Sequence, residues 1–278
     1  MKVLLLGNGT KQGVLETVEA LRPEIERRVT IVASNFDGLE DMSHVEADLA
    51  IVFGGDGSIL RAASQMGINQ IPVLAVHLGT LSFLSTIRVN DLIPLLDRPD
   101  LLALPIVDHL LLECRHCVAQ EEGVARIVLN EVLVQGETSS RIIGLDLHID
   151  GELVTTYRGD GLILSTPVGS TAHNLSAGGP ILRKDIDAVV ISPVNPHTLS
   201  NRPLVDSPDR CYEIRPHQAG VLVLDGAEVI RLKPGDTVRI GRAPQTFKTL
   251  AVPGYSYYRT LRDKLGWNAG FTEDMPAK

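Results

Sequence analysis

The stretch ADLAIVFGGDGSILRAASQM, residues 47–66, decides the fold of the first part of the chain. DLAIVF is an apolar run typical of a strand buried on both faces, and SILRAASQM follows it with helical spacing. The turn between them places Gly54, Gly55 and Gly57 around one carboxylate, Asp56. A turn needs only one Asp-Gly or Gly-Gly pair, so this connection has more glycine than a turn requires. A strand that passes directly into a helix predicts an α/β unit with parallel strands.

The same alternation extends over residues 1–103, so we predict an N-terminal α/β domain with a parallel sheet and flanking helices. Residues 104–255 differ, because short β-like runs joined by Asp-Gly and Pro-Gly turns follow one another. We find no convincing helix between residues 104 and 250 and predict an all-β C-terminal domain there. The tail YRTLRDKLGW regains a helical pattern, so residues 256–278 are expected to complete the first domain.

The bulk properties exclude several classes of protein. The net charge of -8 over 278 residues argues against a general nucleic-acid binder or a polybasic membrane binder. The chain has no run of eighteen apolar residues, and its first residues lack a signal-peptide cleavage region. Three cysteines are too few for a disulfide framework. We therefore expect a cytoplasmic protein without nucleic-acid or membrane partners.

Asp56 allows two interpretations. Anions bind well where strands end and helices begin, because backbone N–H groups there are unsatisfied, and glycine lets a phosphate approach without a Cβ in the way. A carboxylate beside phosphates is repelled unless it holds a proton, a metal ion or a reacting hydroxyl. In phosphoryl transfer, an aspartate that accepts the proton of the attacking hydroxyl has this placement. The alternative is an aspartate that caps the following helix.

A second stretch, YRGDGLILSTPVGSTAHNLSAGGPIL at residues 157–182, opens from a strand into a loop of small hydroxyl residues and glycines. Such a loop suits close backbone contact with a polar or phosphorylated ligand, although a long surface loop is the alternative. Arg158 and Asp160 flank Gly159 and could form an ion pair without functional meaning. In VLNEVLVQ, Asn130 and Glu131 interrupt a strand and can serve one ligand only if the strand ends or bulges there.

Taken together, these segments resemble the NAD kinase family. The resemblance rests on GGDGS near residue 55, LNE at 129–131, the long stretch at 157–182, PHTLSNRPLV at 196–205, LDGAE at 224–228 and the terminal YRTLRDKLGW. A Gly-Asp-Gly turn alone is weak, since diacylglycerol-type lipid kinases and phosphofructokinases carry similar turns. The resemblance implies an α/β domain followed by a β domain, and dimers or tetramers. It also implies transfer of the γ-phosphoryl of ATP, with Mg²⁺ or another divalent cation, to the 2′-hydroxyl of the adenosine ribose of NAD, giving NADP.

Some members of that family accept polyphosphate or NADH, and sequence alone does not choose between these substrates. The resemblance assigns Asp56 to the 2′-hydroxyl as the catalytic base. It assigns NAD binding to Gly57, Asn130, Glu131, Arg158, Asp160, Thr171, Ala172, His173, Ser176 and Asp225. Arg158 and Asp160 match residues near the nicotinamide half. Asp225 also has the simpler interpretation of an Asp-Gly hairpin turn. We expect the phosphate donor near Gly54, Gly55, Ser58 and Lys11.

The chain departs from the family pattern at three positions. Ser58 replaces the usual threonine and keeps the hydroxyl, whereas Ala227 replaces a common glutamine after Asp225-Gly226 and changes the local hydrogen bonding. His173 stands where the family has tyrosine, and a histidine can change its charge near neutral pH.

We therefore predict that NAD binding is weaker than with tyrosine at position 173, or depends on pH. A His173→Tyr variant compared with the parent in NAD titrations across neutral pH tests this. Identical affinities and identical pH profiles would refute the prediction.

The remaining features of the sequence bear on metal binding and on two alternative functions. Cys114 and Cys117 form one C-x-x-C without a second ligand pair, so two strand cysteines are favoured over a zinc site, and we assign no metal ligands. A lipid kinase would need an apolar entrance, which the polar GSTAHNLSAGG loop disfavours. A non-catalytic NAD(P)-binding sensor is the other alternative, which the presence of Asp56 disfavours.

Overall fold

The computed structural model describes residues 1–38, 40–79, 82–84, 87–119, 121–137, 142–198 and 200–267. Its contacts divide the chain into two compact units. Unit 1 comprises Met1–Gln65, Ile71–Val107 and the residues from Lys248 on, and unit 2 comprises Met66–Gln70 and Asp108–Phe247. Apart from the short excursion at Met66–Gln70, the chain crosses between the units inside strands β6 (Ile106–His109) and β20 (Phe247–Leu250).

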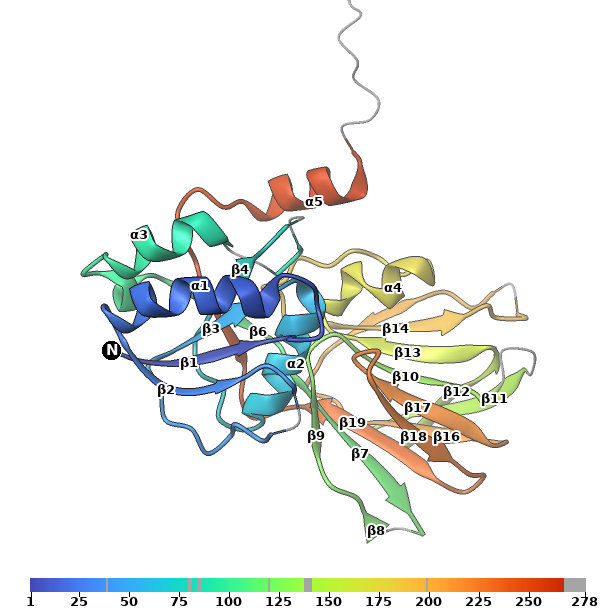
Figure 1. Cartoon of the computed structure of the whole chain (residues 1–278). Coiled ribbons are helices and arrows are strands. Elements are labelled where there is room, and N and C mark those ends of the chain that lie inside the picture. The colour runs from blue at the N-terminus through green and yellow to red at the C-terminus, as the bar shows by residue number, and fades with distance from the viewer. Residues whose placement is uncertain are drawn as a thin grey trace, which may run out of the picture. The chain divides into compact units, whose positions relative to one another are not determined.

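Unit 1 is built on a seven-stranded sheet with the order β2-β1-β3-β4-β20-β6, in which β5 pairs with β4 (Figure 1). Its first strands are β1 (Lys2–Gly7), β2 (Thr30–Asn35), β3 (Leu49–Phe53), β4 (Val73–His77) and β5 (Ile87–Arg88). The pairs among these five strands are all parallel. Every residue of β3 and β4 is buried, as the continuous apolar runs predict.

Helices cover this sheet. They are α1 (Val14–Glu26), α2 (Asp56–Met66), η1 (Val89–Asp91), α3 (Leu92–Leu96), η2 (Leu101–Ala103) and α5 (Tyr257–Leu265). Residues of α1 and α3 share one apolar core with the strands. The chain runs from β1 to β2 in one direction across the sheet and from β3 to β4 in the other. Right-handed crossovers therefore place α1 and α2 on opposite faces.

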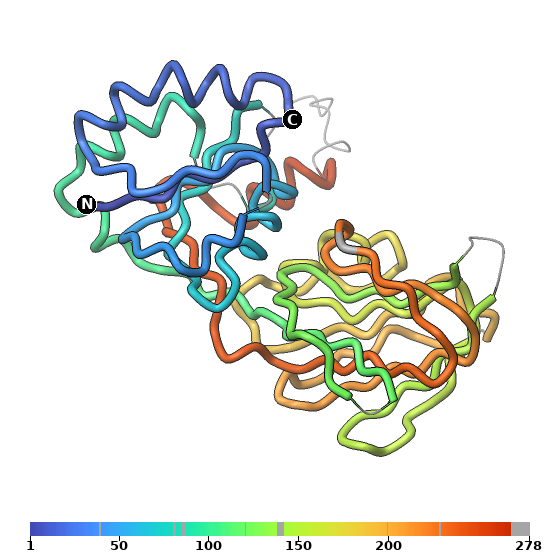
Figure 2. Tube along the Cα trace, turned by 60° about the horizontal axis from the view of Figure 1, so that its bottom comes forward, coloured from blue at the N-terminus to red at the C-terminus, as the bar shows by residue number. Residues whose placement is uncertain are grey.

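Unit 2 contains two antiparallel sheets. The first joins β15 (Leu204–Asp206), β14 (Val189–Val194), β13 (Gly161–Ser165), β10 (Glu131–Gly136), β17 (Gly220–Leu224) and β18 (Glu228–Leu232). The second joins β12 (Glu152–Gly159), β11 (Ile143–Ile149), β16 (Tyr212–Pro216), β19 (Thr237–Arg242), β7 (Leu112–Val118) and β8 (Glu121–Glu122), with β9 (Arg126–Val128) on β7. Residues of both sheets form one apolar core, as in a sandwich (Figure 2).

The predicted fold class is confirmed, with one correction. Unit 2 contains a 3₁₀ turn, η3 (Gly169–Thr171), and a single helical turn, α4 (His173–Ser176), where the sequence predicted no helix. Four residues are too few to show helical periodicity, so tertiary contacts determine this turn. The predicted terminal helix is present as α5, whereas residues 268–278 lie outside the described residues. Among the helices that the structure describes, none is long and apolar enough to span a bilayer.

Candidate active site

The turn that carries Asp56 leaves the sheet of unit 1 where the strand order reverses. β1 and β3 are neighbours, and Gly7 at the end of β1 pairs with Phe53 at the end of β3. The chain leaves these two strands in opposite directions across the sheet. Ligands of open α/β sheets bind at the carboxyl ends of strands at such a reversal. Lys11 follows β1 and Asp56 follows β3, so both belong to this edge.

The glycines of the turn differ in what they do. Gly54 has φ 135°, and a Cβ there would collide with Ser58 Oγ, so the fold itself requires this glycine. Nothing lies within 4 Å of a Cβ built on Gly55 or Gly57. Gly57 lies in the first turn of α2, where glycine costs about 0.5–1 kcal/mol relative to alanine. The space beside Gly55 and Gly57 is therefore open to a ligand.

Asp56 is the first residue of α2, and its carboxylate binds a different segment. The amide of Phe83 donates to Oδ2 (3.1 Å), and the amide of Leu84 donates to Oδ1 (2.9 Å). These bonds fix the carboxylate at the edge of the sheet, while each oxygen keeps a further acceptor position. The capping interpretation is wrong in detail, because the side chain anchors the segment 82–84.

Ser58 and Lys11, the other two residues predicted to lie near the phosphate donor, differ in their exposure. Ser58 is only 6% exposed, and its hydroxyl lies against Gly54. Lys11 is exposed, and no carboxylate pairs with it among the described residues. Lys11 is thus a cation without a carboxylate partner among the described residues, on the segment that follows β1.

Asp225 organises the second group of predicted residues, in unit 2. It lies in the turn between β17 and β18, where Asp225 and Gly226 both have positive φ (50° and 70°), as a tight hairpin requires. Its carboxylate also accepts hydrogen bonds from the amides of Leu129 (2.9 Å), Asn130 (2.7 Å) and Glu131 (3.2 Å). The hairpin interpretation is confirmed, and the same side chain also fixes the Asn-Glu pair.

The Asn-Glu pair lies at a strand end. β10 begins at Glu131, so Asn130 precedes the strand and regular alternation does not separate the two side chains. Thr166 holds the segment from the other side, since its hydroxyl donates to Leu129 O (2.6 Å) and its amide donates to Asn130 O (2.8 Å). A Cβ on Gly169 would meet the Asn130 carbonyl. The pair is therefore held rigidly by neighbouring backbone.

The carboxyl of Glu131 is poorly solvated. The side chain is 6% exposed, and Oε2 has no hydrogen-bond partner among the described residues. Burial, and then the negative charge of Asp225, raise the pKa of Glu131 to about 8, although a hydrogen bond from the His173 amide opposes the shift. Burial also raises the pKa of Asp225, against the three amides that favour its charged form. We infer that Glu131 holds a proton at neutral pH and that Asp225 carries the charge.

This assignment predicts a pH dependence of stability. The pKa of Glu131 is raised in the folded state, so the folded state binds more protons and the free energy of unfolding falls as pH rises from about 4.5 to 8. One proton corresponds to a slope of up to about 1.4 kcal/mol per pH unit. Glutamine resembles the protonated acid, so Glu131→Gln should remove the slope above about pH 6, whereas the raised pKa of Asp225 still contributes below it. Denaturant unfolding from pH 5 to 9 measures it, and parallel curves for parent and variant would contradict the assignment.

The sequence matches two known protein-domain families. The ATP-NAD kinase N-terminal domain family matches residues 7–99, and the ATP-NAD kinase C-terminal domain family matches residues 129–252. The NAD kinase of Rhodopirellula baltica is 46% identical over 271 residues, which is 96% of this chain and 87% of that protein. The chain belongs to the NAD kinase family. It is therefore a kinase.

Other members of the NAD kinase family agree in sequence and fold. The NAD kinase of Azoarcus is 38% identical over 96% of both chains. Yeast NADH kinase, solved with NADH, superposes with a TM-score of 0.85 at 24% identity, covering 99% of this chain and 90% of that one. The Archaeoglobus fulgidus NAD kinase, solved with ATP, superposes with a TM-score of 0.75 at 21% identity, covering 98% of this chain and 100% of that one. At these identities, the two structures show the fold.

In this NAD kinase family member, the loop after β13 contains both accessible and buried residues. His173 and Ser176 are exposed, and Thr171 and Ala172 are half-buried. Asn174 is fully buried, where its Nδ2 donates to Ser170 O (3.2 Å) and Pro180 O (3.1 Å) and its Oδ1 accepts from Ser192 Oγ (2.7 Å). Sequence analysis missed this residue, because an asparagine in a polar loop gives no sign that it holds both ends of the loop.

The family resemblance assigns Arg158 and Asp160 to the nicotinamide half of NAD. The structure places both residues away from the Asn-Glu pair. In the β10–β13 ladder, Glu131 pairs with Ser165 and Gln135 pairs with Gly161. The amide of Gly136 donates to Asp160 O, so Asp160 lies opposite the last residue of β10, about 17 Å from Glu131 at 3.4 Å per residue. Its carboxylate accepts from Asn195 Nδ2 (2.7 Å), and among the described residues no ion pair joins it to Arg158.

The cysteines of this NAD kinase family member lie in a strand, as predicted. Cys114 and Cys117 are buried in β7 and are not disulfide-bonded. The histidine between them, His116, contacts Asp236 Oδ2 through Nε2 (2.8 Å). No three His, Cys, Asp or Glu side chains gather for a metal ion within the described ranges.

Proposed function

We propose that this chain transfers the γ-phosphoryl group of ATP to the 2′-hydroxyl of the adenosine ribose of NAD, giving NADP. Family membership supports phosphorylation of NAD, and the relatives compared above are named NAD kinases. The observation that carries the proposal is the Asp56 carboxylate, fixed by the Phe83 and Leu84 amides at the carboxyl edge of the sheet. A base must be positioned before it can act, and these bonds position it.

The proposed step needs few groups. The 2′-hydroxyl gives its proton to Asp56 while its oxygen forms a bond to the γ-phosphorus, and the bond between that phosphorus and the leaving ADP oxygen breaks. Open space beside Gly55 and Gly57 admits the phosphates to the backbone, and Lys11 supplies positive charge. Because the transition state is loose, alignment and charge neutralisation contribute most of the rate.

A divalent cation fits this arrangement as a companion of ATP. Mg²⁺ is commonly bound by one or two carboxylates together with substrate phosphates, and Asp56 provides one carboxylate at this edge. The described residues offer no cluster of three ligands, so the phosphates of ATP would supply most of the coordination. When bound, the cation neutralises charge that develops on the phosphoryl oxygens.

Unit 2 is proposed to bind the adenosine end of NAD. Asn130 and the protonated Glu131 offer a donor and acceptors for ribose hydroxyls or the base, and Thr171, Ala172, His173 and Ser176 lie on the accessible side of the loop. Asp225 acts as a positioning residue, because its carboxylate is occupied by three amides. We assign Arg158 and Asp160 no role at the adenosine end.

A coupled assay tests the proposal. Purified protein is mixed with NAD, ATP and Mg²⁺, and the NADP formed is measured with an NADP-specific dehydrogenase. Parallel reactions with polyphosphate and NADH define the donor and the acceptor. We expect NADP with NAD and ATP. NAD binding without NADP formation would instead indicate a sensor, and phosphorylation of diacylglycerol would indicate a lipid kinase.

A further inference from the structure

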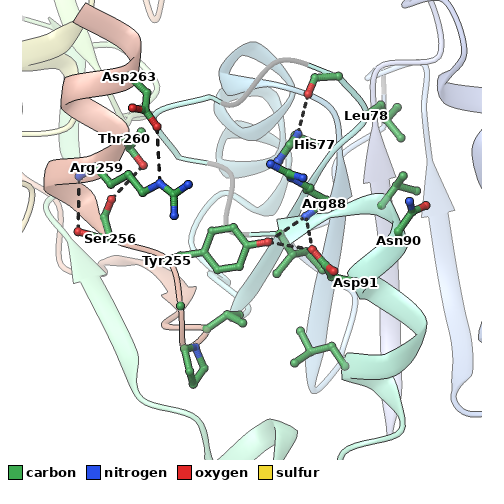
Figure 3. Close-up of a pocket in the computed structure, with 17 residues that line it drawn as sticks. His77, Leu78, Arg88, Asn90, Asp91, Tyr255, Ser256, Arg259, Thr260 and Asp263 are labelled. Carbon is green, nitrogen blue, oxygen red and sulfur yellow. Dashed lines mark hydrogen bonds and ion pairs between the residues drawn. The ribbon is translucent and has the colours of Figure 1, made fainter. Parts of the chain in front are cut away.

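Unit 1 contains an open cavity of about 830 Å³ at the carboxyl end of β4 (Figure 3). Its walls are His77–Gly79, Ile87–Asp91 with Leu95, and the C-terminal segment Val252–Ser256 with one face of α5. A volume of this size is typical of sites for small ligands. None of the residues assigned above to phosphoryl transfer or to NAD lines this cavity.

Arg88 supplies a guanidinium that forms no ion pair among the described residues. Its side chain is exposed, and within the described ranges no carboxylate pairs with its guanidinium. The nearby Asp91 is already engaged, since its Oδ2 accepts from the Arg88 amide (3.3 Å) and from the Tyr255 hydroxyl (3.0 Å). A planar guanidinium without a partner is the group best suited to bind a phosphate in two-point fashion.

Figure 3 shows Arg259 and Asp263 on the side of the cavity that α5 forms, opposite His77 and Arg88. Arg259 Nε lies 3.8 Å from Asp263 Oδ2, and the two side chains are 69% and 41% exposed. Such an exposed pair contributes little, so Arg259 can turn to an anion without much loss. The cavity therefore has two arginines and two aspartates, and Asp91 Oδ2 already accepts two hydrogen bonds from within the wall.

His77 points to a second feature of the ligand. The side chain is 7% exposed, and its Nδ1 donates to Gly79 O (2.9 Å). In the neutral ring this leaves Nε2 as an acceptor, and Nε2 has no partner among the described residues. A buried polar atom without a partner is unfavourable; Nε2 itself has almost no accessible surface, so a ligand hydroxyl satisfies it only when the cavity wall around His77 opens slightly.

We propose that this cavity binds a sugar phosphate, with its phosphate on Arg88 and Arg259 and one hydroxyl donating to His77 Nε2. The side-chain amide of Asn90, and the positions of the Tyr255, Ser256 and Thr260 hydroxyls that their bonds within the protein leave open, offer partners for further sugar hydroxyls. The proposal is independent of the kinase reaction, because the two sets of residues do not overlap.

Calorimetric titration of the full chain with ribose 5-phosphate, in the presence of saturating NAD, tests the proposal. Ribose and inorganic phosphate are the matched probes. We expect the wild type to bind ribose 5-phosphate at least ten-fold more tightly than either probe. Arg88→Gln should lose at least ten-fold in affinity for ribose 5-phosphate and keep its affinity for ribose.

Arg98→Gln is the matched control. Arg98 is also a surface arginine of unit 1, but it pairs with Asp100 (2.7 Å) and does not line the cavity. This variant should bind ribose 5-phosphate as the wild type does, and all variants should melt at similar temperatures. No binding by the wild type, equal binding of inorganic phosphate (an anion site only), or unchanged binding by Arg88→Gln would overturn the proposal.

The kinase assay separates this proposal from the proposed function. Arg88→Gln should keep the wild-type kcat/KM for NAD in the absence of sugar phosphate. A wild type that binds ribose 5-phosphate but forms no NADP would contradict the proposed function alone. A wild type that forms NADP but does not bind ribose 5-phosphate would contradict the sugar-phosphate site alone.

Discussion

Asp56→Asn is expected to lower kcat for NADP formation by about 10²–10⁴-fold, the contribution typical of a general base. Asparagine has nearly the same size and keeps one oxygen for the Phe83 and Leu84 amides, but it cannot take a proton from the 2′-hydroxyl. The loss should therefore appear mainly in kcat, and the Kd for NAD should rise by no more than about ten-fold, because only the contact with the 2′-hydroxyl is weakened. Steady-state kinetics and calorimetric NAD titration of the same protein measure both quantities.

Asp41→Asn is the control for this change. Asp41 is an exposed aspartate of unit 1 whose carboxylate also accepts a backbone amide, that of Ser43 (2.8 Å). Its replacement should leave kcat unchanged. If Asp56→Asn weakened NAD binding and kept kcat, Asp56 would have a structural role only.

Asp225→Asn is expected to have the second largest effect. Asparagine tolerates the left-handed backbone at this turn, so the change isolates the loss of negative charge. The three backbone amides lose a charged acceptor. The side-chain NH₂ group of asparagine also faces these N–H donors without being able to accept a hydrogen bond from them. We expect the free energy of unfolding to fall by about 2–4 kcal/mol. The KM for NAD should rise about ten-fold or more, equivalent to ~1.4 kcal/mol, because the Asn-Glu pair loses its support.

Asp150→Asn provides a matched comparison. Asp150 also lies in an Asp-Gly hairpin turn with φ 51°, and its carboxylate accepts the amide of Cys211 (2.9 Å), but it is exposed. In denaturant unfolding, Asp150→Asn should lower the free energy of unfolding by less than about 1 kcal/mol, as is usual for surface substitutions. Equal losses at the two positions would mean that turn geometry, and not the buried charge, determines the effect of Asp225.

The sequence is sufficient for strands β1–β4 of unit 1, because each has an apolar pattern of its own, but it places β6 and β20 in the all-β domain. It also locates Asp56 in a turn where glycine exceeds the need of the backbone, and Gly55 and Gly57 indeed face open space. The distinction between Gly54, which the backbone requires, and its neighbours is not visible in the sequence, because it depends on φ and on Ser58.

What the sequence does not reveal depends on contacts between distant residues. Asp56 binds amides 27 and 28 residues away, and Asp225 binds amides 94 to 96 residues away. No local pattern encodes such pairs, since strand register and turn geometry create them. Register also explains why Asp160 lies far from Glu131 although both belong to motifs of the same family.

The most direct measurement compares NAD with its analogue that lacks the 2′-hydroxyl of the adenosine ribose, in the parent and in Asp56→Asn. If Asp56 faces that hydroxyl, the parent should bind NAD about ten-fold more tightly than the analogue and should not phosphorylate the analogue. Asp56→Asn should bind the two nearly equally. Phosphorylation of the analogue by the parent, or an undiminished preference for NAD in Asp56→Asn, would contradict the account.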